Sequence, residues 1–249
     1  MKKLIFSILL LASTLQASDI YVKPGESIAD AIRQARELRR LNDPSIEGGI
    51  TIHVAAGNYR IYEPLFLRPE DSGTPSSPTI IKGEGEVIVS GGVTVTGWKR
   101  QGKLMVADVP DFCGRPLDFR QFYVNGKKAV RARDIADFED MYRIIRVDKQ
   151  KRVLWVPAAA VRKIQKAPYA EMVLHEMWCV ANLRIKDIMF AGDSAAVSFH
   201  DPESRIQFEH PWPCPMVTTD GHNSAFYLTN ARELLDVPGE WYHDIRAGK

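Results

Sequence analysis

Five polar and aromatic side chains gather near the C-terminal end of the chain, where they could bind a polar ligand. His210 and Trp212 lie in a proline-rich segment, and Asp220, His222 and Asn223 lie in a glycine-containing loop. A sugar ring stacks its C–H edges on a flat aromatic face, while carboxylate, amide and imidazole groups bond to its hydroxyls. We predict that these five residues contact a saccharide. The alternative is a proline-stiffened loop that only covers the core.

Two further carboxylates, Glu240 and Asp244, share one face of a strand predicted over residues 240–245. Four residues at roughly 3.3 Å each separate them by about 13 Å. Hydrolysis of a glycosidic bond needs two carboxyl groups about 5–5.5 Å apart for retention, or roughly 6.5–9.5 Å apart for inversion. Glu240 and Asp244 are therefore excluded as a catalytic pair, and the sequence assigns no catalytic residue.

A possible metal motif begins at His175 and Glu176, in the manner of a zinc-protease helix. Cys179 occupies the position of the second histidine, and the neighbouring residues alternate as in a strand, with Trp178 on one face. We therefore predict no metal site. No phosphate-loop motif is complete either, because Trp98 stands where a lysine is required, and we predict that the protein has no cofactor.

The charge balance argues against nucleic acid as a partner. The chain has 33 Lys and Arg residues, 31 Asp and Glu residues and a net charge of +2. Residues 1–17 contribute Lys2, Lys3 and no acid, so without them 31 residues of each sign remain. A neutral chain with mixed charges lacks the basic face that nucleic acid requires.

Residues 1–17 have the pattern of a secretory signal peptide. Two lysines precede a short apolar core, and Ala17 is a small residue at the predicted cleavage site. The apolar core is shorter than the roughly 20 residues that span a bilayer, so we predict a secreted or periplasmic protein without a membrane anchor. Export permits disulfides, but an odd number of cysteines cannot all pair within one chain. We predict three small buried side chains: Cys113, Cys179 and Cys214.

The first elements after the signal are a helix and short strands. Ser27 is a helix N-cap candidate, and an apolar face follows it with helical spacing at Ile28, Ala31, Ile32, Ala35, Leu38 and Leu41. Short strands rich in Ile, Val and Leu come next, each closed by Gly, Asn or Pro. This pattern is typical of the first coils of a right-handed parallel β-helix over residues 18–92, with the helix as its cap. A small antiparallel sandwich is the alternative.

Residues 93–249 change to alternating strands with longer loops, which predicts an antiparallel β domain, inserted or appended. Asn125-Gly126 between two such strands predicts a two-residue hairpin. The last predicted strand, 240–245, has a turn behind it and no return strand. We therefore expect the chain to be the N-terminal piece of a longer protein, truncated before the main β-helix. The whole is predicted to be mostly β.

The chain resembles exported, polysaccharide-degrading right-handed parallel β-helix proteins of the glycoside hydrolase family 141 type. The resemblance rests on residues 55–59, 67–74, 90–92 with 97–98, 122–126, 129–133, 226–228, 235–236 and 238–242. It implies a β-helix fold and a polysaccharide or oligosaccharide substrate. In proteins of this type the proposed catalytic acids lie in later coils, so no catalytic residue is carried over.

This resemblance implies the N-terminal part of a secreted β-helix glycoside hydrolase that acts on a complex polysaccharide. Two alternatives stay open. A polysaccharide lyase could use the same fold, with a Lys or Arg base. The chain could also be a non-catalytic carbohydrate-binding or structural module, and we expect it to be inactive alone.

Overall fold

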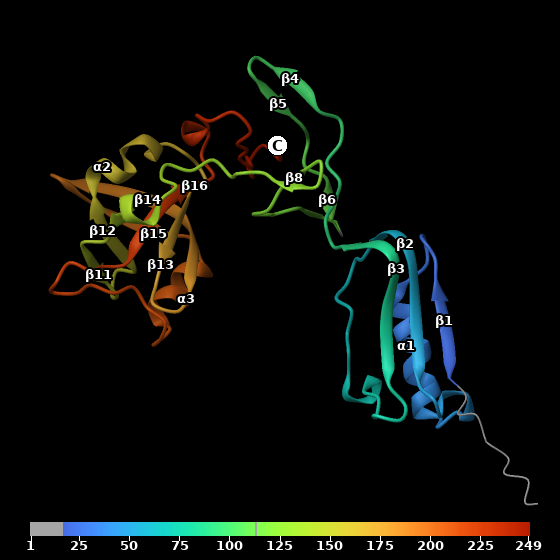
Figure 1. Cartoon of the computed structure of the whole chain (residues 1–249). Helices are drawn as coiled ribbons and strands as arrows, with labels where there is room; N and C mark the ends of the chain where they lie inside the picture. The colour runs from blue at the N-terminus through green and yellow to red at the C-terminus, as the bar shows by residue number, and fades with distance from the viewer. Residues whose placement is uncertain (1–16, 113) are drawn as a thin grey trace, which may run out of the picture. The chain divides into compact units, whose positions relative to one another are not determined.

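The computed structural model describes residues 17–112 and 114–249 of the chain. The predicted signal peptide, apart from its last residue, and Cys113 lie outside the described residues. The described residues divide into two compact units, one that ends at Thr94 and one that begins at Val95, and each is described by itself. Both units are mostly β, as predicted, with few helices (Figure 1). No described helix is long and apolar enough to cross a membrane.

The first unit is a three-stranded parallel sheet with one helix against it (Figure 1). Strand β2 pairs in parallel with β1 on one side and with β3 on the other, so Ser18 lies opposite Ile50, and Ile50 opposite Thr79. The β2–β3 register shifts between Ala55 and Gly57, and β2 continues through both residues. The elements are β1 (Ser18–Val22), α1 (Ile28–Arg40), η1 (Pro44–Ile46), β2 (Ile50–Arg60), η2 (Pro69–Asp71) and β3 (Thr79–Ser90).

Helix α1 begins and ends as its sequence predicts. The Ser27 hydroxyl accepts a hydrogen bond from the Asp30 amide at 3.2 Å, and Asn42 ends the helix with φ of 49°. Most of the predicted apolar face is buried against the sheet, but Leu41 is 68% exposed, which corrects the prediction at that position. Leu41 is the C-cap residue and lies beyond the last turn that packs on the sheet.

The second unit contains a seven-stranded sheet with strand order β10-β16-β13-β14-β15-β12-β11, in which every pair is antiparallel. Only two residues separate the two edge strands in the chain, so the sheet curls around its core. Its strands are β10 (Tyr142–Arg143), β11 (Arg146–Asp148), β12 (Val153–Pro157), β13 (Glu171–His175), β14 (Val180–Ala191), β15 (Ser194–Phe199) and β16 (Ala225–Thr229).

Short elements complete this unit. The hairpin predicted at Asn125-Gly126 is confirmed, because both residues have positive φ, 50° and 75°, between the short strands β8 and β9. The elements are β4 (Lys99–Gln101), β5 (Leu104–Val106), β6 (Asp111–Phe112), β7 (Arg115–Pro116), β8 (Tyr123–Val124), β9 (Lys127–Lys128), η3 (Phe138–Asp140), α2 (Ala158–Val161), η4 (Arg162–Ile164), α3 (Glu203–Glu209) and η5 (Arg232–Leu234).

The two faces of the large sheet differ in polarity. Met172, Leu174 and Phe226 point into the apolar core, where each is fully buried. The alternate positions, including Glu171 and His175, face the other way. This second face is covered in part by the segment before β10, and it holds the buried charge described below.

The strand predicted over residues 240–245 does not form. Trp241 makes one bridge, parallel to Arg131, and its amide and carbonyl bond to Val130 and Ala132. The amide of His243 then bonds to the Asn230 side chain at 2.9 Å. These backbone groups are therefore satisfied without a return strand, which removes that argument for a truncated chain.

Candidate functional site

The five predicted saccharide contacts lie in the loop between α3 and β16. Trp212 is 46% exposed, and its amide donates to His210 Nδ1 at 3.2 Å. Asp220 accepts from the His222 amide at 3.3 Å. The Thr218 hydroxyl and then the His222 amide hold the pKa of Asp220 below its usual value. These residues therefore form two local turns.

Asn223 has a structural role in this loop. Its Oδ1 accepts from the Thr218 amide at 2.8 Å, and its Nδ2 donates to the Ile144 carbonyl at 2.7 Å. Among the residues that the structure describes, no hydrogen bond or ring contact joins the His210–Trp212 turn to the Asp220–His222 turn. The saccharide role of the five residues stays a prediction.

The His175–Cys179 segment is a hairpin tip. Strand β13 ends at His175, so Trp178 lies in the turn and is 75% exposed, which corrects its placement on a strand. Glu176 bonds to Cys179 Sγ at 3.1 Å and to Gln207 Nε2 at 2.6 Å. Burial and then the Arg143 charge lower the pKa of His175.

Neither described cysteine is fully buried, which corrects that prediction. Cys179 is exposed, Cys214 is half-buried, and both are free. Within residues 17–112 and 114–249, no group of three His, Cys, Asp or Glu side chains could hold a metal ion.

A buried ionic cluster on the polar face of the large sheet was not predicted. Glu171, fully buried, accepts from Arg131 at 2.7 and 3.2 Å and from Arg120 at 3.0 Å. Arg131 also bonds to Asn230 and lies over the Trp241 ring at 5.5 Å. Such a network holds distant segments together, and its carboxylate is fully engaged. Alternation along β13 indicates that Glu171 faces away from the apolar core, but no local sequence pattern indicates its arginine partners.

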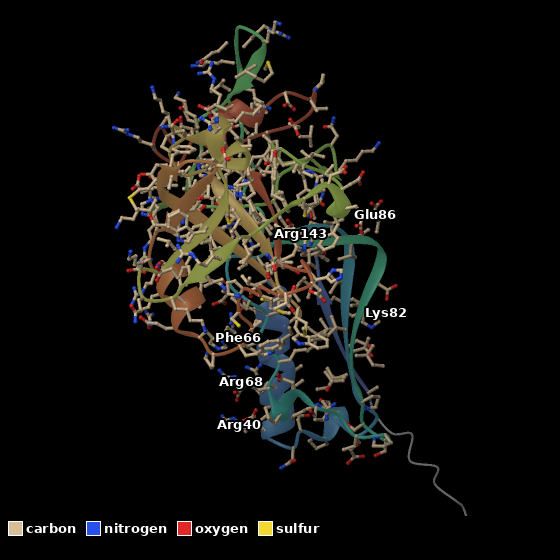
Figure 2. The ribbon with its side chains drawn as sticks, turned by 90° about the vertical axis from the view of Figure 1, so that its left-hand side faces the viewer. Arg40, Phe66, Arg68, Lys82, Glu86 and Arg143 are labelled. Carbon is tan, nitrogen blue, oxygen red and sulfur yellow. The ribbon has the colours of Figure 1, made fainter. Side chains whose placement is uncertain are left out.

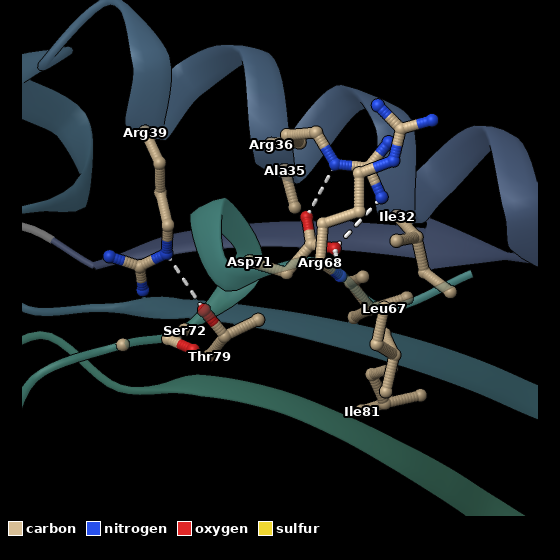
Figure 3. A pocket seen from close by; sticks show the side chains of 12 residues that line it. Ile32, Ala35, Arg36, Arg39, Leu67, Arg68, Asp71, Ser72, Thr79 and Ile81 are labelled. Carbon is tan, nitrogen blue, oxygen red and sulfur yellow. Dashed lines mark hydrogen bonds and ion pairs between the residues drawn. The ribbon is translucent and has the colours of Figure 1, made fainter. Parts of the chain in front are cut away.

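The first unit contains a pocket of about 230 Å³ between α1 and the sheet (Figure 3). Arg36 binds Asp71 through two bonds of 2.7 and 2.8 Å, and Arg39 donates to Thr79 at 2.7 Å. Arg36 also bonds to the carbonyl of Phe66, and Phe66 and Arg68 lie beside α1 (Figure 2). Arg36 and Arg39 are thus engaged by the protein itself: Arg36 joins the helix to the loop after β2, and Arg39 joins it to the first residue of β3.

A hollow of about 300 Å³ in the second unit has a different character. The rings of Tyr169 and His200 stack at its wall, 6.2 Å between centroids and 21° apart. Lys186, Asp187 and Arg246 add two positive charges and one negative charge. Among the described residues none of these three charged side chains has an ion-pair partner, so their hydrogen-bonding groups are available to a ligand.

The comparisons with known proteins agree on one group. The model of the "GH141 insertion domain" family matches residues 102–249. A solved structure named "Glycoside hydrolase" is similar to this chain, with 61% identity and a TM-score of 0.78. The match covers 93% of this chain and 42% of the solved chain, so this chain spans less than half of that protein's length. No protein of curated function matches.

Proposed function

This chain belongs to the GH141 family, and we propose that it forms part of an exported glycoside hydrolase that acts on a complex polysaccharide. The match of residues 102–249 to the insertion domain carries this proposal. The 61% identity to a protein named glycoside hydrolase supports it.

We further propose that the first unit forms the first coils of a right-handed parallel β-helix. Two features support this proposal. Strands β1, β2 and β3 pair in parallel in the order of the chain, as successive coils do. Strand β3 also leaves apolar side chains uncovered, since Ile81, Ile88 and Val89 are 45–47% exposed, as expected where another coil stacks.

Three carboxylates of the described residues are engaged in structural bonds. Asp71 and Glu171 are held by arginines, and Glu240 accepts from the amides of Asp236 and Val237. A general acid needs a proton and a nucleophile needs a free oxygen, so these groups are unsuited to either task. We propose that the catalytic pair lies in the remainder of a longer protein, and that this chain supplies a cap and a substrate-contacting domain.

Product analysis on the longer native protein tests the reaction. A hydrolase releases reducing ends from a polysaccharide without products that absorb ultraviolet light. A lyase on the same fold would release reducing ends together with absorbing unsaturated products. Heat-denatured protein is the control. If neither product forms from a panel of plant and host polysaccharides, the enzymatic proposal is wrong.

Export is tested separately. We propose cleavage after Ala17, because a small residue there follows a basic and then an apolar segment. N-terminal sequencing of the protein recovered from the periplasm or medium should begin at Ser18. Protein that stays in the cytoplasm with Met1 retained would contradict export.

A further inference from the structure

The hollow beside Tyr169 is built by two irregular backbone positions. Tyr169 has φ of 61°, an uncommon value for a residue other than glycine, and Asn230 Nδ2 bonds to its carbonyl at 3.3 Å. The β14–β15 register shifts between Ile185 and Asp187, which places Lys186 at a β-bulge. Bulges and strained residues concentrate at functional sites because they redirect side chains.

The cations of this hollow differ from the arginines of the unit that are held in ion pairs. Arg131 and Arg120 form ion pairs with Glu171, and Arg184 pairs with Glu203 at 2.6 Å. Lys186 and Arg246 line the hollow and, within the described part of the chain, have no acidic partner. A lysine and an arginine that converge on one concave surface without a partner favour an anionic ligand.

From this geometry we infer that the hollow binds one acidic sugar residue of a polysaccharide chain. Lys186 and Arg246 would bind its carboxylate or sulfate, Asp187 would accept from its hydroxyls, and the Tyr169 ring would contact its C–H edges. A volume of about 300 Å³ is at the lower end of ligand sites, as suits one sugar ring. The inference rests on the proposed function for its choice of a saccharide.

Calorimetric titration of the full chain tests the inference with three trisaccharides. Trigalacturonate provides carboxylates, its methyl ester has the same shape without the charge, and a sulfated galactose trisaccharide provides sulfates. Lys186→Ala and Arg246→Gln each remove one cation from the hollow. Lys149→Ala removes an exposed lysine from the β11–β12 turn and is the matched control.

We expect an anionic trisaccharide to bind, and its affinity to fall about 10-fold or more in both hollow variants and to stay unchanged in Lys149→Ala. The trisaccharide that binds more tightly identifies carboxylate or sulfate as the recognised group. Chemical shift changes should centre on His200 and Lys186. Failure of both anionic sugars to bind, equal binding of the ester, or unchanged affinity in either hollow variant would overturn the inference. The hydrolysis assay on the longer protein is independent of these outcomes.

Discussion

Glu171 and Arg131 are 40 positions apart in the sequence, yet two bonds of 2.7 and 3.2 Å join them beneath the surface of the second unit. Glu171 has no solvent exposure and the Arg131 side chain only 10%. Arg131 also donates a hydrogen bond to Asn230 and lies over the Trp241 ring. The ion pair therefore links β13 to the segment before β10 and to the C-terminal segment. The stability of this region should depend on the completeness of this network.

Replacement of Glu171 by alanine should destabilise the second unit by about 3–5 kcal/mol, because it leaves Arg131 buried without its counter-charge. Equilibrium denaturation measures the change in unfolding free energy. Glu139→Ala removes an exposed acid and should change stability by less than about 0.5 kcal/mol. A loss below about 1 kcal/mol in Glu171→Ala would show that Arg131 finds another partner or water.

The C-terminal segment depends on the Asn230 side chain. Asn230 has φ of 59°, accepts from the His243 amide at 2.9 Å and donates to the His243 carbonyl at 3.1 Å. Asn230→Gly retains the backbone conformation and loses these bonds, which should cost about 1–3 kcal/mol. Asn230→Ala should cost roughly 1–2 kcal/mol more, because alanine disfavours this conformation. Hydrogen exchange should show the residues after Trp241 opening in both variants, and protected amides there would refute this role.

The first unit should lose the stabilisation that His53 provides as pH rises above the ordinary histidine pKa of about 6.5. His53 lies between Glu84 at 2.8 Å and Asp19 at 2.9 Å, and bonds to Glu84 and then Asp19 raise its pKa above 6.5. Because the folded pKa is the higher one, the stabilisation is complete below the unfolded pKa of about 6.5 and is lost as pH rises through the folded value.

Comparison of the native chain with His53→Gln across this pH range measures that contribution. The difference in unfolding free energy should shrink as pH rises, and the His53 ring protons should titrate above 6.5. A His53 ring that titrates below 6.5 would contradict the prediction.

The Cys179 thiol should be alkylated slowly although the residue is exposed. Local burial of the sulfur and then the Glu176 carboxylate raise its pKa from 9.0 to about 11. At pH 8 this leaves about 100-fold less thiolate than in an ordinary thiol, and alkylation requires the thiolate. Mass spectrometry should show slow iodoacetamide labelling of Cys179 in the folded chain and fast labelling in urea. Glu176→Gln should speed labelling of the folded chain, and equal rates in folded and unfolded protein would exclude a raised pKa.

Local sequence determined the elements whose stabilising contacts are close in the chain. The Ser27 cap and the spacing from Ile28 to Ala35 suffice for α1, because every contact that defines them lies within a few turns. Asn125-Gly126 determined the β8–β9 hairpin in the same way, since its positive φ angles are a property of two residues. The resemblance to family 141, seen in the sequence, agrees with the insertion-domain match.

Tertiary structure alone decided the rest, because the decisive partners are distant in sequence. Residues 240–245 alternate like a strand. In the structure, however, Trp241 makes only one bridge to Arg131, and the His243 amide bonds to the side chain of Asn230 and not to a neighbouring strand. Glu171 is an ordinary acid in the sequence, and only folding places two arginines against it. The hollow beside Tyr169 also draws its charged groups from β14 and the C-terminal segment. Chain folding over such separations brings together side chains that no local spacing relates.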